Sequence, residues 1–377
     1  MPPKKFPTVW KAEPHTIAKI EILKAYLVAW FQILGRTKRD QELLYVDGFA
    51  GPGEYTNHPQ GSPLAALTAA KAALDRTTNQ WIASTVHCAF IEPDGARFEH
   101  LKNKIRSVQC PPTVLIHPYN LSFIDGIAQL RNDLPRSFKG DSPLFAFIDP
   151  FGATGVPFVN IIQLLKSPCS EVLINLDSDG IARIFQAGQA ADHEVNLTAI
   201  FGDDEWRKTL SSSDDFPTLC RKVLRLYKSK LKRIPRVYYC FSFEMRTSAH
   251  ALNYHLVFAS QHPLGLEKMK EAMKKIDQDG DYCFSDASAN QPALFRFDDP
   301  TYYSDSMFDH FRGKKAVYHE LRDFALNESP FLNPKSILKN LELRNLIDVV
   351  SRQPRGKGTF NENKLLYVQF KQERKHG

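Results

Sequence analysis

Tyr45 to Pro63 reads YVDGFAGPGEYTNHPQGSP, and this stretch decides the fold. A strand-like apolar run, 43–46, meets an acid at Asp47 and then three glycines within residues 48–53. Glycine lets another group come close to the main chain. A glycine-rich turn between a first strand and a first helix is the binding edge of a doubly wound α/β sheet. The stretch therefore predicts a ligand-binding loop, with a tight turn that binds nothing as the alternative.

Short apolar runs alternate with helical patterns on either side of this loop. The five expected strands are 43–48, 86–94, 113–117, 144–150 and 171–176. With helices between them, they predict a parallel sheet covered on both faces. Two further strands, 236–245 and 251–260, predict an antiparallel hairpin on the sheet edge. This α/β pattern, five parallel strands plus a terminal hairpin, resembles the Rossmann-like seven-stranded fold of S-adenosylmethionine-dependent methyltransferases.

The chain is expected to have three parts. Residues 1–40 contain an amphipathic helix from Ile17, which we expect to pack on the core. Residues 41–285 form the methyltransferase-like domain, in which Ser62 caps the first helix after the loop. Residues 290–377 read as helix (314–326), helix and hairpin, the outline of a winged helix-turn-helix.

The composition indicates an ordinary globular protein, since 43% of its 377 residues are hydrophobic and 24% are charged. The net charge of +7 is concentrated in two blocks. Residues 220–236 hold eight Lys or Arg and no acid, and residues 334–377 hold ten against four acids. Such blocks bind nucleic acid in some proteins and are solvated faces in more.

The six cysteines are scattered without a CxxC pair, so we expect no metal site in this chain. No apolar run approaches the length of a membrane span, and the opening residues are polar and proline-rich. We therefore expect a cytoplasmic protein with reduced thiols and no membrane partner.

The loop itself has the form Asp-x-Phe-x-Gly-x-Gly, from Asp47 to Gly53. It lacks the GxGxxG of dinucleotide enzymes and the GKS/T of a triphosphate site. It resembles the first motif of nucleic-acid amino-methyltransferases, which implies S-adenosylmethionine as the cofactor. The residues expected to bind it are Asp47, Gly48, Phe49, Ala50, Gly51, Gly53, Glu92 and Asn120. Asp47 is expected to hold the ammonium group or a bridging water.

Glu92 ends the second strand, in the sequence FIEPD. A carboxylate there can accept two hydrogen bonds from the ribose diol of a nucleoside. A solvated glutamate is the alternative. Asn120, after the third strand, is placed near the expected position of the adenine amine.

The fourth strand ends in Asp149-Pro150-Phe151-Gly152. Amino-methyltransferases carry Asp/Asn-Pro-Pro-aromatic here, where the carboxylate or amide orients the target amine and the aromatic ring stacks on a flipped base. The single proline and the DPFG form look more like the tRNA guanine N2-dimethyltransferases. Asp149, Pro150 and Phe151 are therefore the expected catalytic residues, although Asp149 could instead cap the next helix. Asn175 and Asp177, expected just past the fifth strand, could line the same cleft or simply cap that strand.

In the expected wing, Arg352, Arg355 and Lys357 surround two glycines. These side chains suit contact with phosphates better than reading of bases.

The chain as a whole resembles the three-Cys-motif partner protein (TcmP) family. The matching stretches are HTIAKIEILKAYLVAWFQIL, YVDGFAGPGEY, GSPLAAL, FIEPDGARFEHL, PLFAFIDPFGATGVPF, SEVLINL and YHLVFASQHPLGLEKMKEAM. The resemblance implies a methyltransferase-like domain with a winged helix. It also implies a partner whose three-cysteine motif is like that of radical S-adenosylmethionine enzymes.

Three functions remain open at this point. The first is a methyltransferase acting on an exocyclic amine of DNA or RNA. The second is a non-catalytic subunit that delivers nucleic acid to the radical-enzyme-like partner in repair or modification. The third is a small-molecule methyltransferase whose winged helix serves dimerisation. The intact loop with Glu92 and Asp149 favours the first over the second, and the basic C-terminal block disfavours the third.

Overall fold

The structure is a computed structural model that describes residues 7–150, 155–249, 251–277, 282–286 and 300–372. It has two compact units, Met1–Asp277 with Cys283–Pro292, and Gln278–Tyr282 with Ala293–Gly377. Each unit has a hydrophobic core of its own. Within the residues described, no helix is both long and apolar enough to cross a membrane.

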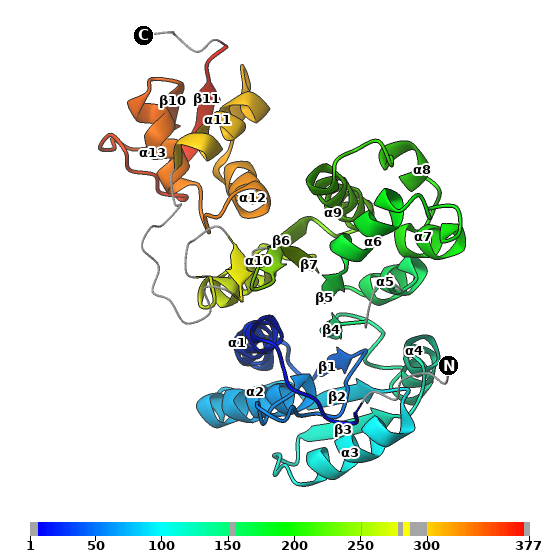
Figure 1. Ribbon diagram of the computed structural model, residues 1–377. Coiled ribbons are helices and arrows are strands. Elements are labelled where there is room, and N and C mark those ends of the chain that lie inside the picture. Colours follow the sequence, from blue (N-terminus) through cyan, green and yellow to red (C-terminus); the bar gives the residue numbers. More distant parts are fainter. Residues whose placement is uncertain (1–6, 151–154, 250, 278–281, 287–299, 373–377) are drawn as a thin grey trace. The chain divides into compact units, whose positions relative to one another are not determined.

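The first unit is built on one mixed, mostly parallel sheet with the strand order β3-β2-β1-β4-β5-β7-β6-β8 (Figure 1). The parallel strands are β1 (Glu42–Asp47), β2 (Thr85–Ile91), β3 (Val114–Tyr119), β4 (Leu144–Ile148) and β5 (Ser170–Leu176). The antiparallel hairpin is β6 (Tyr239–Arg246) and β7 (Leu252–Ser260), with β7 next to β5. The five parallel strands and the hairpin confirm the α/β architecture predicted from the sequence.

An eighth strand, β8 (Cys283–Ser285), pairs in parallel with β6 and forms the edge of this sheet. Our expectation of seven strands, with the hairpin at the edge, is therefore wrong in its count. Three residues are too few to show an alternating pattern, so nothing in the sequence distinguishes β8 from a loop.

Helices cover both faces of the sheet. One face carries α1 (Pro14–Thr37), α2 (Ser62–Thr77) and α10 (Pro263–Lys274), with α3 (Gly95–Arg106) beside α2. The other carries α4 (Phe123–Asp133), α5 (Phe158–Leu165), α6 (Ser178–Gln186), α7 (Glu194–Phe201) and α9 (Phe216–Lys232), with the short α8 (Trp206–Thr209) between the last two. Figure 1 shows α1 and α2 lying side by side, away from α5, α6 and α9.

The strands are apolar on both faces because helices bury both. In β1, Leu44 and Val46 join the core under α4, α5, α6 and α9. The neighbouring Tyr45 lies on the opposite face, where its ring stacks on Phe145 with 6.1 Å between centroids. The Tyr26 ring of α1 packs on Phe145 from the same side, at 5.0 Å. The N-terminal helix predicted from Ile17 is thus confirmed and belongs to the packed core of the first unit.

The second unit consists of α11 (Pro300–Phe311), β9 (Lys315–Ala316), α12 (Tyr318–Glu328), α13 (Lys335–Leu343), β10 (Ile347–Ser351) and β11 (Leu365–Phe370). Its antiparallel sheet has the order β10-β11-β9. The two helices and the hairpin that we predicted are confirmed. The first helix begins at Tyr318 rather than at 314, because Lys315 and Ala316 pair with β11 instead.

Candidate functional site: the cleft at the carboxyl ends of the strands

The glycine loop leaves β1 at Asp47 and reaches α2 at Ser62. Gly51 has a φ of +61°, which favours glycine, and a Cβ added there would meet nothing within 4 Å. At Gly61 an added Cβ would lie 2.8 Å from the carbonyl carbon of Gly53, so the two ends of the loop touch. The loop is therefore closed on itself, while the backbone around Gly51 stays open to a ligand.

Asp47 lies beneath the loop and is fully buried. Its carboxylate accepts hydrogen bonds from the Phe49 backbone N–H (3.3 Å), the Tyr45 hydroxyl (3.4 Å) and the Ser62 side chain. Burial raises the pKa of Asp47 to about 7, and these hydrogen bonds oppose the shift. The structure thus places Asp47 as a support of the loop. Ser62, which we expected to be the N-cap, is instead the first residue of α2, and Gly61 holds the cap position.

Glu92 follows β2 and is also buried. Its Oε2 accepts the Gly51 backbone N–H at 2.9 Å, and its Oε1 accepts the Asp94 backbone N–H at 2.9 Å. Burial raises the pKa of Glu92, and the two backbone donors oppose that shift. Asn120 is exposed and donates to the carbonyl oxygens of Glu92 (2.9 Å) and Pro93 (3.2 Å). The structure therefore brings Glu92 and Asn120 together with the loop.

Asp149, just after β4, makes the strongest polar contact of the site. Its Oδ2 lies 2.5 Å from Nζ of Lys19, a residue of α1 that is only 6% exposed. Its Oδ1 accepts a hydrogen bond from Asn175 Nδ2 at 2.7 Å. Pro150 lies beside it, and Phe151 falls outside the described residues. Asp149 is thus held by two donors from different parts of the chain and does not cap α5, which begins at Phe158.

Part of this set lines a cleft of about 280 Å³, whereas Asp47, Glu92 and Asn120 are not among its lining residues. Its walls include Phe49, Ala50 and Gly51 of the loop, Asp149 and Pro150, Asn175 and Asp177, and side chains of α1 and β7. Asp177 lines the cleft and also caps α6, since its Oδ1 accepts the Gly180 backbone N–H at 2.7 Å. Asp177 therefore lines the cleft, as one sequence interpretation had it, and its capping of α6 was not predicted.

The sequence analysis did not identify a histidine–carboxylate pair beside the cleft. His15 Nδ1 lies 2.8 Å from Oδ2 of Asp286, and His15 Nε2 lies 3.3 Å from Nδ2 of Asn253. An acceptor faces Nδ1 and an amide NH₂ faces Nε2, an arrangement that is satisfied when the ring carries a proton on Nδ1 and accepts at Nε2. The pair joins positions 271 residues apart, which no local pattern can predict.

Lys19 was also missed, although its sequence does contain a signal. It lies on the buried stripe of α1, three residues before Ile22 and four before Leu23, where an ammonium group needs a partner. Two buried oxygens near the cleft have no hydrogen-bond partner among the described residues, namely Asn175 Oδ1 and Asp286 Oδ1. Buried polar atoms are nearly always satisfied, so two unpaired acceptors suggest a ligand or water that donates to them.

The three basic residues expected in the wing differ in their surroundings. Arg352 and Lys357 are exposed. Arg355 is partly buried and forms an ion pair with Glu342 of α13, whose other oxygen accepts the Gly358 backbone N–H at 2.6 Å. Arg355 therefore anchors the loop between β10 and β11, and only the other two face solvent freely.

Comparisons with known proteins give weak matches. No protein-family model matches the chain, and no curated protein matches it. Among solved structures, Trm1 from Pyrococcus horikoshii with S-adenosyl-L-methionine shares 11% identity, with a TM-score of 0.31. That match covers 74% of this chain and 64% of Trm1, so less than two thirds of that protein is matched.

Two other solved structures are similar to a comparable degree. The O-methyltransferase from Bacillus cereus in complex with SAH shares 13% identity with a TM-score of 0.33, covering 63% of this chain and 80% of that one. The cyclopropane synthase MmaA2 from Mycobacterium tuberculosis shares 13% with a TM-score of 0.27, covering 69% of each chain. These TM-scores are too low to assign this chain a family or an activity.

Proposed function

We propose that this chain is an S-adenosylmethionine-dependent methyltransferase that acts on an exocyclic amine of a nucleic-acid base. One observation carries the proposal: the cleft at the carboxyl ends of the strands is lined by hydrogen-bond acceptors. Asp149 and the unpaired Asn175 Oδ1 both lie there. Such a lining suits a ligand that presents N–H donors or positive charge.

The residues around the loop fit S-adenosylmethionine. A carboxylate offers about four acceptor positions, so Glu92 keeps about two for a ribose diol after binding its two backbone donors. The open backbone at Gly51 allows close contact. Asp47 would act from below, by holding the loop in place. When bound, the cofactor supplies an electrophilic methyl group on a sulfonium centre.

The chain's own residues would prepare the amine. Asp149 and Asn175 Oδ1 would accept its two N–H bonds and turn its lone pair toward the methyl group. The amine must then lose a proton. His15 Nε2 is the candidate general base: Asp286 faces Nδ1, and Nε2 would exchange its contact with Asn253 Nδ2 for the proton of the amine. Phe151 keeps its expected role in stacking the base, with Pro150 beside Asp149 in the same motif.

Residues 290–377 would contribute a winged helix-turn-helix in this proposal. The order α11, β9, α12, α13, β10, β11 and the exposed Arg352 and Lys357 support that assignment. Replacing both with glutamine should weaken binding of duplex DNA, measured by fluorescence anisotropy. The slope of log K against log salt concentration should fall by about two, because two phosphate contacts are lost. We further propose that the protein works with a three-Cys-motif partner in the cytoplasm.

A second function is favoured by a specific contact. The Lys19 ammonium already occupies Asp149, which is where the target amine would bind. A subunit that binds nucleic acid for its partner without catalysing methyl transfer would retain such an ion pair at no cost to its function. Transfer of a tritiated methyl group from the cofactor to cellular tRNA, or to DNA, distinguishes the two functions.

Calorimetric titration of S-adenosylmethionine and its demethylated product tests the cofactor site directly. We expect micromolar binding by the wild type and a loss of about tenfold or more in Glu92→Ala, since hydrogen bonds to a charged group contribute about 1.5–3 kcal/mol. Asp149→Asn keeps the acceptor oxygen and should bind the cofactor as the wild type does. If the folded wild type does not bind either compound, the methyltransferase proposal fails.

A further inference from the structure

The basic segment 220–236 divides into two groups once its side chains are placed on α9. Lys222, Lys230 and Arg233 lie on one side and are paired with acids. Lys222 Nζ lies 2.7 Å from Asp214 Oδ2. Lys230 and Arg233 pair in the same way with acids next to α8.

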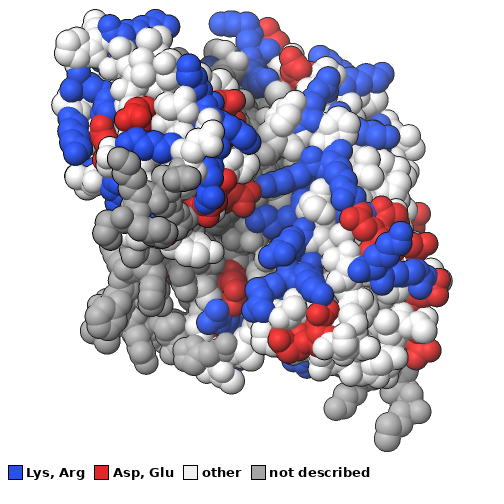
Figure 2. Space-filling model, turned by 90° about the horizontal axis from the view of Figure 1, so that it is seen from above, with Lys and Arg blue, Asp and Glu red and all other residues white. Residues whose placement is uncertain are grey.

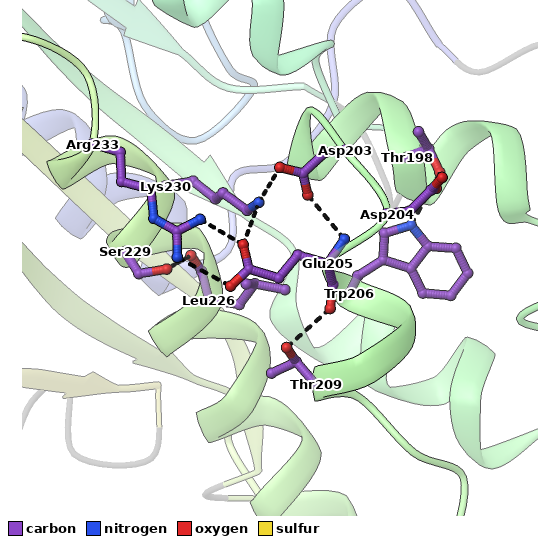
Figure 3. Close-up of polar contacts among 10 residues, drawn as sticks. All are labelled: Thr198, Asp203, Asp204, Glu205, Trp206, Thr209, Leu226, Ser229, Lys230 and Arg233. Atoms are coloured by element: carbon purple, nitrogen blue, oxygen red, sulfur yellow. Dashed lines mark hydrogen bonds and ion pairs between the residues drawn. The ribbon is translucent and has the colours of Figure 1, made fainter.

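Figure 3 shows this second pairing, in which Lys230 and Arg233 converge on Glu205. Lys230 is only 4% exposed, and its Nζ lies 2.7 Å from Glu205 Oε2 and also contacts Asp203. The Glu205 backbone N–H donates to Asp203 Oδ1 at 2.9 Å. These cations therefore fix the α7–α8 segment onto α9. Because acids neutralise them, they are poor candidates for binding an acidic partner.

The remaining cations follow a different line along the helix. Arg221, Arg225, Lys228 and Lys232 are spaced four, three and four residues apart, so they form one stripe. Arg221, Arg225 and Lys232 are exposed and Lys228 is partly so. Figure 2 looks onto the end of the molecule where α9 lies in Figure 1 and shows Lys and Arg side chains gathered in a band.

Three cations of this stripe have no ion pair among the described residues, although Arg221 interacts electrostatically with Asp215 at the N-terminus of α9. Arg221 Nη2 donates to the Thr218 hydroxyl at 2.8 Å, and Lys228 Nζ lies 5.8 Å from the centroid of the Phe241 ring. Within the described part of the chain, Arg221, Arg225 and Lys228 have no ion pair. Like charges four residues apart on a helix destabilise it slightly, so the stripe adds nothing to the stability of α9 by itself.

We propose that this stripe, Arg221, Arg225, Lys228 and Lys232, binds the sugar-phosphate backbone of a nucleic acid. The choice of partner rests on the proposed function. Cations four residues apart on a helix are about 6 Å apart, close to the separation of successive phosphates along a strand. The whole stripe spans about 16 Å at 1.5 Å per residue, enough for about three phosphates.

α9 packs against α6, and Asp177, the N-cap of α6, lines the cleft. The stripe therefore lies on the helix next to the one that begins at the cleft. Contact with phosphates alone makes this surface independent of base sequence.

Binding of fluorescein-labelled oligonucleotides to the full chain tests the surface. Single-stranded DNA, single-stranded RNA and duplex DNA of equal length are titrated between low and physiological salt. The test variant carries Arg221→Gln, Arg225→Gln and Lys228→Gln. The matched control carries Arg39→Gln, Lys71→Gln and Arg76→Gln, which removes the same charge from exposed positions on and next to α1 and α2. A second variant, Arg221→Lys, Arg225→Lys and Lys228→Arg, keeps the charge.

We expect the test variant to bind about tenfold more weakly than wild type at physiological salt, with a salt slope smaller by about two to three. The control and the charge-conserving variant should stay within about twofold of wild type, since only cations at the stripe contact phosphates. Comparison of the three probes shows whether DNA or RNA is preferred. Equal binding by the test variant and the control, or no binding of any probe by wild type, overturns the proposal.

The cofactor titration is repeated on the same variants. The stripe lies outside the cleft, so all of them should bind S-adenosylmethionine as the wild type does. A protein that binds nucleic acid through the stripe but never binds the cofactor would support this surface and reject methyl transfer. The reverse result would reject the surface alone.

Discussion

Each end of the central sheet holds a carboxylate beside α1, one partly buried and the other buried, and the two have different partners. At the carboxyl ends of the parallel strands, Asp149 is paired with the charged Lys19 at 2.5 Å. At the other end, Glu171 accepts the Tyr26 hydroxyl at 2.5 Å and the Ser260 hydroxyl at 2.6 Å. Burial raises the pKa of Glu171, because its partners are neutral and offset little of the lost hydration.

The difference indicates which of the two carboxylates, Asp149 or Glu171, belongs to a candidate binding site. Glu171 lies beside an apolar cavity of about 340 Å³, larger than the cleft, yet a Cβ at Gly265 would come within 1.9 Å of its Oε1. The carboxylate itself is held by two hydroxyl donors and packs tightly on Gly265, which indicates a role in stability. Near Asp149, Asn175 Oδ1 is buried without a partner among the described residues. Unpaired acceptors, rather than volume or a buried acid alone, distinguish the candidate site.

The largest effect on the free energy of unfolding should come from the titration of Asp47. Its pKa is raised to about 7 from 3.8, so the folded chain holds this proton more tightly than the unfolded chain. The stabilising contribution is therefore full below about pH 4 and is lost as the pH rises through 7. At 1.36 kcal/mol per pKa unit, it falls by on the order of 3 kcal/mol between pH 5 and pH 8.

Asp47→Asn should remove this part of the pH dependence. All four tryptophans (Trp10, Trp30, Trp81 and Trp206) are in the first unit, so their fluorescence in urea follows its unfolding. The control is Asp75→Asn, an exposed change on α2 that should leave the profile as in wild type. Parallel profiles for wild type and Asp47→Asn would show that Asp47 does not titrate in this range.

Gly265→Ala, at the amino ends of the parallel strands, should lower the free energy of unfolding by nearly as much. The new methyl group would overlap the Glu171 carboxylate and lie 2.6 Å from the Ser260 hydroxyl oxygen. Overpacking of this kind costs about 3 kcal/mol in the urea measurement. Gly95→Ala, at the first residue of α3 where nothing lies within 4 Å, is the control and should be neutral or slightly stabilising. Equal stability of both variants would mean that α10 shifts freely.

Lys19→Met tests the ion pair between Lys19 and Asp149 at the carboxyl ends of the strands. It leaves Asp149 with a single donor, Asn175, in a partly buried setting. Breaking a fully buried pair costs about 3–5 kcal/mol, and with Asp149 21% exposed we expect about 2 kcal/mol. Adding Asp149→Asn should recover part of that loss, because the uncompensated charge is gone. A double variant as unstable as the sum of the single changes would argue against a direct pair.

The smallest effects compare two buried tyrosines on the same face of the sheet. The Tyr26 hydroxyl donates to Glu171 at 2.5 Å, whereas the Tyr45 hydroxyl reaches Asp47 at only 3.4 Å. Tyr26→Phe should cost about 1.5 kcal/mol and Tyr45→Phe about 0.5 kcal/mol, since hydrogen bonds weaken steeply with length. A reversed order in the urea measurement would contradict the contrast between the two ends.

Local patterns determined much of the fold. The apolar runs identified β1 to β7 of the large sheet and the hairpin of β10 and β11, and the three-and-four spacing from Ile17 identified α1. These signals are strong because both faces of the sheet and one stripe of the helix are buried, and burial imposes apolar residues at fixed intervals. The strand ends at Asp47, Glu92 and Asp149 could be placed at one edge of the sheet for the same reason.

Only the tertiary structure decided what those residues contact. Asp47 supports the loop from below, Asp149 is paired with Lys19 of α1, and His15 meets Asp286 across most of the chain. In α9 and in the wing, the tertiary structure separates cations that are paired with acids from cations that are exposed. A sequence gives the number of charges in a segment, but ion pairs join residues distant along the chain, and their partners are set by packing.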